Sequence, residues 1–263
     1  MPLPYTGKNG ELNFERDFID TLKKRGWSKD VLNHQTIPEL IENWKNIIFD
    51  RNRNVLNNVP LSDSEMDRLM DTVREQANTP IKSNIFITGK DVPVRRDGDS
   101  PDQKNAGSDV ILNIFSPGEV AGGTSQYQIA EQVVFNQQED TRDRRGDITL
   151  LINGMPVIHI ELKASGVDVF EAAHQIKKYI QERKFQGFMS LVQVFWAITP
   201  EDALYFANPG TAERMNSAFF FHWGDRDNHI IRDWREIIDG ESRILSIPEA
   251  HRMIGYYAVA DKE

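Results

Sequence analysis

One segment of the sequence carries acidic and basic side chains at a spacing that suits metal-dependent phosphate chemistry. Asp147 opens an aliphatic run, Asn153-Gly154 follows it, and a second aliphatic run ends in Glu161-Leu162-Lys163. Two carboxylates brought together suit a hard cation such as Mg²⁺, which prefers oxygen ligands. Such a cation polarises a phosphate and lowers the pKa of a bound water, and a nearby lysine stabilises developing negative charge. The segment therefore predicts a site for metal-assisted phosphodiester hydrolysis.

The two aliphatic runs must pair as a hairpin for these groups to meet. Asn-Gly between two β-rich runs is a strong hairpin signal. With a two-residue loop and no bulge, Asp147 would oppose Ile160 and point away from Glu161. One additional residue in the loop, or one β-bulge, places Asp147 opposite Glu161. Opposed β-carbons then lie about 4.5–5.5 Å apart, close enough for both carboxylates to hold one ion.

The alternation of side chains decides between the two registers. In the shifted register one face of the hairpin is aliphatic and the other is mostly polar, and burial of six aliphatic side chains at ~1.5–3 kcal/mol each outweighs a turn preference. We therefore expect Asp147, Glu161 and the Leu162 carbonyl to bind the metal. Lys163 would either orient the attacking water or stabilise the phosphoryl oxygens. The aliphatic face is Ile148, Leu150, Ile152, Ile158, Ile160 and Leu162, and the other is Asp147, Thr149, Leu151, Val157, His159, Glu161 and Lys163.

Glu-x-Lys also occurs on ordinary solvated strands, and two other segments carry similar letters. Glu182-Arg183-Lys184 falls in a helical run, where positions i and i+2 do not share a face. Pro101-Asp102-Gln103-Lys104 lies in a turn-rich loop. The 147–163 hairpin alone supplies an aliphatic scaffold. His159, on its polar face, is expected to pack or to approach DNA rather than to bind metal.

The helix that follows the hairpin makes the pattern specific. Helical periodicity after Gly166 places Gln175 and Tyr179 on one face. Asp, Glu-Leu-Lys and a following Gln-x-x-x-Tyr resemble the PD-(D/E)xK nuclease fold, and more narrowly the N-terminal nuclease domain of the restriction (R) subunit of type I restriction-modification enzymes. The resemblance implies that Asp147, Glu161 and Lys163 are the catalytic trio of a type I site-specific deoxyribonuclease. It implies that Gln175 and Tyr179 orient substrate or catalytic groups, whereas the alternative for both is an exposed helix face.

The resemblance extends to the N-terminal segment. Residues 11–22 form an amphipathic helical pattern that stops at Gly26-Trp27. The resemblance implies that Glu15, within this helix, is an extra acidic residue near the metal. A solvated helix glutamate is the open alternative.

The rest of the sequence predicts an α/β domain (α+β, with a mixed sheet), with helices flanking a central mixed sheet in a restriction-endonuclease-like core. Helices are expected at 37–50 and from Ser62, which forms a capping box with Glu65, to about Gln76. Strands are expected at 85–88, 109–115, 126–135 and 191–198, with a further one at 219–223. We expect an endonuclease domain over residues 1–245 with a helical insertion around 37–77, and the start of a linker toward a motor domain over 246–263.

Composition narrows the class of protein. The 263 residues include no cysteine, which excludes disulfides and cysteine-ligated zinc and fits a reducing cytoplasm. The sequence shows no signal peptide and no apolar run long enough to span a membrane. A net charge of −9 argues against a general polyanion-binding surface. Phosphates could still meet a local basic strip, which comprises Arg142, Arg144, Arg145, Lys163, Lys177, Lys178, Arg183 and Lys184.

The resemblance also implies partners. It implies Mg²⁺, double-stranded DNA, methyltransferase and specificity subunits, and cleavage of unmodified foreign DNA after ATP-driven translocation. Thr88-Gly89-Lys90 lacks the upstream glycine of a phosphate-binding loop, so ATP is expected only in a motor absent from this chain. We therefore expect the N-terminal portion of a longer polypeptide. A standalone PD-(D/E)xK nuclease and a non-catalytic interaction module of the same fold stay open as alternatives.

Overall fold

A six-stranded mixed sheet forms the centre of the protein. The computed structural model describes residues 4–89, 91–119, 123, 125–135 and 144–257. The sheet order is β1-β4-β5-β6-β7-β8, with β1–β4 and β6–β7 parallel and the other neighbours antiparallel. A separate antiparallel pair joins β2 to β3. The strands are β1 Leu32–Asn33, β2 Asp91–Arg95, β3 Asp109–Asn113, β4 Tyr127–Phe135, β5 Arg144–Ile152, β6 Met155–Leu162, β7 Val194–Thr199 and β8 Asp202–Ala207.

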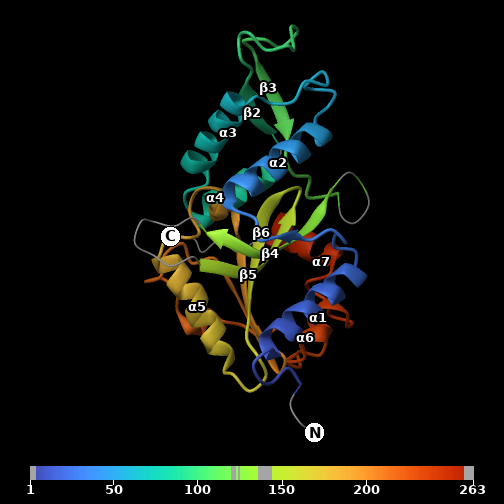
Figure 1. The fold of residues 1–263 in the computed structure, drawn as a ribbon, viewed down its shortest axis with the longest axis vertical. Coiled ribbons are helices and arrows are strands. Elements are labelled where there is room, and N and C mark those ends of the chain that lie inside the picture. The colour runs from blue at the N-terminus through green and yellow to red at the C-terminus, as the bar shows by residue number, and fades with distance from the viewer. Residues whose placement is uncertain (1–3, 90, 120–122, 124, 136–143, 258–263) are drawn as a thin grey trace.

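Helices cover the sheet and extend beyond it. Helices α1 and α5 lie on either side of the central strands, whereas α2, α3 and the β2–β3 pair lie together in the upper part of the molecule (Figure 1). This arrangement is the mixed α/β fold with flanking helices that the sequence predicts. The helices are α1 Gly10–Lys24, α2 Ile37–Arg51, α3 Asp63–Gln76, α4 Pro80–Thr88, α5 Val169–Gln181, α6 Trp234–Ile238 and α7 Ile247–Arg252, with short turns η1 Gly187–Leu191, η2 Ser217–Phe219 and η3 Met253–Tyr257.

Helix starts follow local capping chemistry. Ser62 accepts a hydrogen bond from the backbone N–H of Glu65, and the Glu65 side chain accepts one from the backbone N–H of Ser62, so the predicted capping box is confirmed. Asp168 caps α5 by accepting from the Phe170 N–H at 3.0 Å. This cap fixes the first turn of the helix that carries Gln175 and Tyr179.

The β5–β6 hairpin adopts the shifted register. Asn153 and Gly154 have φ of 53° and 81°, the left-handed values of a two-residue primed turn. The register shifts between Leu150 and Leu151, so that Leu150 pairs with Ile158. Val157 is the additional residue and forms a β-bulge. The sequence leaves open whether a longer loop or a β-bulge produces the shifted register, and the structure contains the bulge.

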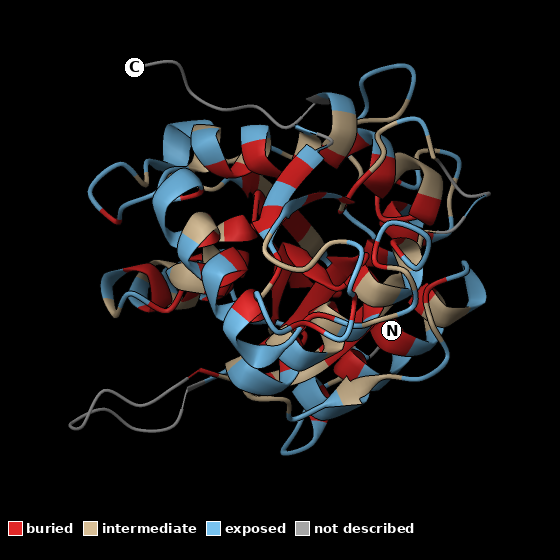
Figure 2. Ribbon diagram, turned by 90° about the horizontal axis from the view of Figure 1, so that it is seen from above, coloured by how far each residue is buried: buried red, intermediate tan, exposed pale blue. Residues whose placement is uncertain are grey.

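Both faces of the hairpin are buried. Every residue of the aliphatic face is 0% exposed, and so are Thr149, His159 and Glu161 on the polar face. Buried residues concentrate on the sheet and on the helix surfaces that face it (Figure 2). The polar face is therefore an interior surface of the protein.

Two expected strands are wrong. Residues 85–88 belong to α4, because Thr79 caps a helix that starts at Pro80 and places Phe86 and Ile87 inward. The 219–223 segment contributes only an isolated bridge between Phe221 and Tyr205.

The other expected strands form with adjusted roles. The 109–115 run forms β3 but pairs with β2 rather than in the main sheet. The 126–135 run forms β4, while the run predicted from residue 191 becomes a strand only at Val194. The segment between β1 and β4 holds α2, α3, α4 and the β2–β3 pair, which is more than the helical insertion expected around 37–77.

The segment expected to start a linker packs onto the domain as far as Ile254, which is 0% exposed. His251 Nδ1 lies 2.9 Å from the Tyr127 hydroxyl, and His251 Nε2 lies 3.0 Å from the Ser116 carbonyl. Residues 258–263 lie outside the described part, so the boundary at 245 and its relation to a motor stay predictions. Within the described residues, no helix has the length and apolar character needed to cross a membrane.

Candidate active site

The predicted trio meets at one end of the β5–β6 hairpin. The register places Asp147 opposite Glu161, and the Asp147 carboxylate accepts a hydrogen bond from the Leu162 N–H at 2.8 Å. Lys163 follows the end of β6, and its Nζ lies 2.9 Å from the Leu162 carbonyl and 3.4 Å from Glu11 Oε1. Two carboxylates, one amine and the carbonyl expected to bind metal therefore share one small region.

The two carboxyl groups sit in an environment that disfavours their negative charge. Burial and the neighbouring Glu161 raise the pKa of Asp147 well above its usual range. Burial also raises the pKa of Glu161 to about 8, although the Lys163 charge and hydrogen bonds with Asp147 oppose the increase. A divalent cation would favour both anions. The oxygen-only donor set of two carboxylates and one carbonyl suits Mg²⁺.

Helix α5 holds Glu161 from the polar face of the sheet. Gln175 Nε2 donates to Glu161 Oε2 at 2.6 Å and to the Tyr179 hydroxyl at 2.7 Å. The Tyr179 hydroxyl donates to the Arg145 carbonyl at 2.7 Å. Tyr179 is 3% exposed, so the alternative of an exposed helix face does not describe it. Gln175 thus contacts a member of the trio directly, and Tyr179 reaches it through Gln175.

Helix α1 brings a third carboxyl group toward the trio. Glu15 is 4% exposed and accepts a hydrogen bond from Gln132 Nε2 at 2.8 Å. Burial raises the pKa of Glu15 to about 7; the Gln132 hydrogen bond opposes this increase, whereas the Asp147 charge adds to it. The alternative of a solvated helix glutamate therefore does not hold. Metal ligation by Glu15 stays a prediction.

Sequence reasoning missed Gln132. Its φ is 55°, a left-handed value that is uncommon for a residue other than glycine, and it lies within strand β4 between Glu131 and Val133. Strained backbone of this kind often occurs at functional sites. No motif marks Gln132, because its role depends on which helix packs over that strand.

His159 packs beneath the trio. Its side chain is 0% exposed, with Nε2 2.9 Å from Glu161 Oε1 and Nδ1 3.1 Å from the Thr149 hydroxyl. Burial lowers the pKa of His159 to about 4, so the imidazole is neutral at pH 7. Of the two expected roles, packing and approach to DNA, burial leaves packing.

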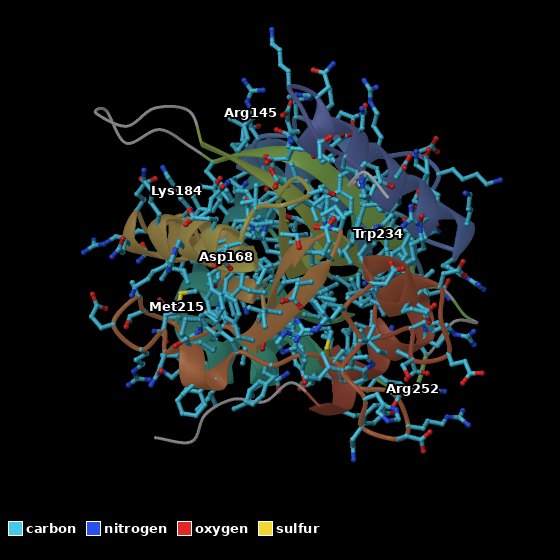
Figure 3. All side chains as sticks on the ribbon, turned by 90° about the horizontal axis from the view of Figure 1, so that it is seen from below. Arg145, Asp168, Lys184, Met215, Trp234 and Arg252 are labelled. Carbon is cyan, nitrogen blue, oxygen red and sulfur yellow. The ribbon has the colours of Figure 1, made fainter. Side chains whose placement is uncertain are left out.

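The expected basic strip is only partly on the surface. Arg145 is exposed at the start of β5, whereas Lys184 is 8% exposed. Both flank Tyr179, since the Tyr179 hydroxyl donates to the Arg145 carbonyl and the Lys184 N–H donates to the Tyr179 carbonyl. Figure 3 labels both residues, Lys184 beside α5. Lys178 and Arg183 are exposed, and Lys163 and Lys177 are partly exposed. Arg142 and the Arg144 side chain lie outside the described residues.

The Asp102-Gln103-Lys104 segment has a structural role. The Asp102 carboxylate accepts hydrogen bonds from Asn57 at 2.9 Å and from Asn105 at 2.7 Å, which closes the loop before β3. Lys104 is exposed. The resemblance of these letters to a nuclease motif is therefore coincidental.

Comparison with known proteins agrees with this arrangement. Residues 11–214 match the family model described as type I restriction enzyme R protein N terminus. The chain is 26% identical over 252 residues to type I restriction enzyme endonuclease subunits of Staphylococcus saprophyticus and Staphylococcus aureus, which covers 96% of this chain and 24% of each relative. It is 36% identical over 103 residues to an Escherichia coli type I restriction enzyme endonuclease subunit, covering 38% of this chain and 33% of that protein. The chain thus spans about a quarter of the length of the staphylococcal relatives. It belongs to the family of type I restriction enzyme R protein N-terminal domains.

Proposed function

We propose that this domain is a Mg²⁺-dependent endonuclease that hydrolyses phosphodiester bonds of double-stranded DNA. The observation that carries the proposal is the meeting of Asp147, Glu161 and Lys163 at one end of a bulged hairpin, with Gln175 bonded to Glu161. Relatives that align with 96% of the chain are named endonuclease subunits, which supports the same activity here.

Each residue has a role that its contacts suit. Asp147, Glu161 and the Leu162 carbonyl would hold Mg²⁺, with Glu15 as a further ligand. When bound, Mg²⁺ supplies polarisation of the phosphate and a water of lowered pKa. Lys163 would orient that water or stabilise the phosphoryl oxygens. To do so its Nζ must leave the Leu162 carbonyl, 2.9 Å away, and the exposed Glu11 carboxylate, 3.4 Å away.

The wider setting of the activity is also a proposal, because the chain spans only about a quarter of its staphylococcal relatives. We infer that the domain acts in the cytoplasm within a complex that contains methyltransferase and specificity subunits. An ATP-driven motor outside this chain would deliver unmodified foreign DNA to the site. The net charge of −9 supports dependence on such delivery, since an acidic domain attracts phosphates weakly.

The test compares two lysine variants in the full-length R subunit, assembled with its partners. Lys163→Ala is expected to abolish DNA cleavage while ATP-dependent translocation continues. Lys104→Ala provides the matched control, because Lys104 is an exposed lysine in the structural loop that mimics the motif. Gel electrophoresis measures cleavage, and a separate translocation assay shows that each variant assembles and moves DNA.

Two results would change the proposal. Cleavage that survives Lys163→Ala would remove the catalytic assignment and favour the non-catalytic interaction module. Mg²⁺-dependent cleavage by the isolated 263-residue chain would favour a standalone nuclease over a domain that depends on delivered DNA.

A further inference from the structure

His159 makes side-chain contacts that connect two neighbouring strands to the candidate metal site. It lies on β6 directly opposite Thr149 of β5. Its Nδ1 is 3.1 Å from the Thr149 hydroxyl and its Nε2 is 2.9 Å from Glu161 Oε1. All three side chains are 0% exposed. The imidazole therefore bridges a hydroxyl and a carboxylate inside the protein.

We propose that His159 is a positioning residue that orients Glu161 for the metal, with Thr149 fixing the imidazole tautomer. The inference rests on the proposed metal-dependent function. With a metal bound, Glu161 would be an ionised carboxylate that only accepts hydrogen bonds, so Nε2 of His159 would carry the proton and Nδ1 would accept from the Thr149 hydroxyl. The chain of donors then runs from Thr149 through His159 to Glu161.

Glu161 is held at both of its oxygen atoms. Nε2 of His159, on β6, lies 2.9 Å from Glu161 Oε1. Gln175, on α5, donates to Glu161 Oε2 at 2.6 Å. Asp147 also forms hydrogen bonds with Glu161, and a cation shared by both carboxylates would replace the contact between the two carboxyl groups. Hydrogen bonds from outer residues to ligating groups fix their orientation, and loss of such a bond typically weakens metal binding about 10- to 100-fold.

Aromatic side chains enclose the imidazole. The rings of Phe185 and Phe195 lie 5.0 Å and 6.1 Å from it, and those of Phe135 and Tyr179 lie 6.2 Å and 6.3 Å away. This surrounding leaves His159 little freedom to rotate. An apolar replacement would leave the buried Glu161 Oε1 without the imidazole that lies 2.9 Å from it.

Gly146 explains how the ring fits. A β-carbon at this position would lie 2.4 Å from His159 Cε1 and 3.1 Å from the Phe135 ring. The ring is rigid and buried, so a methyl group at position 146 would displace it. The glycine that precedes Asp147 is therefore part of the same arrangement.

The test measures Mn²⁺ binding to the 263-residue chain by electron paramagnetic resonance, without DNA. His159→Leu is expected to weaken Mn²⁺ binding about 10- to 100-fold. His159→Gln retains an amide donor near the position of Nε2 and should restore most of the affinity that His159→Leu loses. Thr149→Val removes only the hydroxyl and should weaken binding by a smaller factor.

Matched controls separate positioning from packing. Phe206→Leu disturbs buried aromatic packing beyond the rings that enclose His159, through its contacts with Phe195 and Phe220, and it should leave Mn²⁺ affinity unchanged. Thermal unfolding shows which variants fold. If His159→Leu does not fold, Thr149→Val takes its place in the test. Nitrogen NMR of the imidazole in Mg²⁺-saturated protein should show the Nε2–H tautomer.

The outcomes distinguish this inference from the proposed function. Mn²⁺ binding that is lost in Asp147→Asn but unchanged in folded His159→Leu overturns the positioning role alone. The Nδ1–H tautomer does the same. Wild-type protein that binds no Mn²⁺ overturns the proposed function and this inference with it.

A double-mutant cycle tests the role of Gly146. Gly146→Ala should weaken Mn²⁺ binding in the wild-type background and have a much smaller effect in His159→Leu, because the ring that it displaces is absent. Equal effects in both backgrounds would show that Gly146 acts independently of His159.

Discussion

Replacing Glu161 with glutamine should change how the stability of the metal-free domain depends on pH. Burial raises the pKa of Glu161 to about 8 from an ordinary value of 4.5, and the adjacent Asp147 pKa is raised as well. At pH values between 4.5 and about 8, the folded state therefore binds more protons than the unfolded chain. Stability contributed by such a group is present at low pH and falls as pH rises toward the folded pKa.

The magnitude follows from the pKa of Glu161. Between about pH 6.5 and about pH 8, a carboxyl group with these two pKa values lowers the free energy of unfolding by roughly 1–2 kcal/mol. The neutral His159, whose pKa burial lowers to about 4, adds an opposite slope only below about pH 6.5. Wild type should therefore lose roughly 1–2 kcal/mol more than Glu161→Gln across this window.

Urea unfolding in EDTA at several pH values measures this difference. Mg²⁺ at about 100 times its Kd should add ~2.7 kcal/mol to wild type and little to Glu161→Gln, because the variant lacks one ligand charge. Glu75→Gln, at an exposed position on α3, is the control and should follow wild type. Parallel pH curves for wild type and Glu161→Gln would refute the claim that burial of Glu161 is costly.

Three further predictions concern the elements around the trio. Tyr179→Phe removes the hydroxyl that is hydrogen-bonded to Gln175 and to the Arg145 carbonyl. It should lower the kcat for DNA cleavage about 10-fold or more, the low end for loss of a hydrogen bond to a ligating group, and lower the stability measured by thermal unfolding by ~1 kcal/mol. An unchanged kcat would contradict its orienting role. Glu15→Gln should weaken Mn²⁺ binding in a titration if Glu15 is a ligand, whereas unchanged affinity would leave it a structural residue. Deletion of Val157 removes the bulge residue but keeps Leu150 opposite Ile158, and hence Asp147 opposite Glu161, so Mn²⁺ binding should persist. The loss of one buried valine should lower the free energy of unfolding in urea by ~1.5–3 kcal/mol. A folded deletion variant that binds no Mn²⁺ would contradict the register argument.

The hairpin could be predicted because its evidence is local. Alternation of aliphatic and polar residues gives the register, and register gives the apposition of Asp147 and Glu161. The same alternation cannot separate a three-residue loop from a bulge at Val157, since both add one residue. That choice depends on backbone dihedral angles at Asn153 and Gly154, which are both left-handed in the structure.

Errors elsewhere have equally local causes. The run Ile85-Phe86-Ile87-Thr88 is too short for periodicity to distinguish a strand from a helix. The information that decides lies upstream, in the Thr79 cap and in Pro80 at the first helical position. Gln132 is out of reach for another reason, because its contact with Glu15 comes from a helix distant in the sequence.

The polar face of the hairpin shows why pattern alone does not predict its burial. A face with threonine, histidine and two carboxyl groups would normally be assigned to solvent, because an unpaired buried polar group costs roughly 1–3 kcal/mol. Here the groups satisfy one another: His159 lies within hydrogen-bond distance of both Thr149 and Glu161, and Gln175 connects Glu161 to Tyr179. A fully connected network of this kind tolerates burial and fixes the geometry of its members. The polar residues that predict a catalytic site are therefore also the residues whose mutual hydrogen bonds allow the site to be buried between the sheet and helix α5. Their burial becomes evident only once α5 is seen to pack over them.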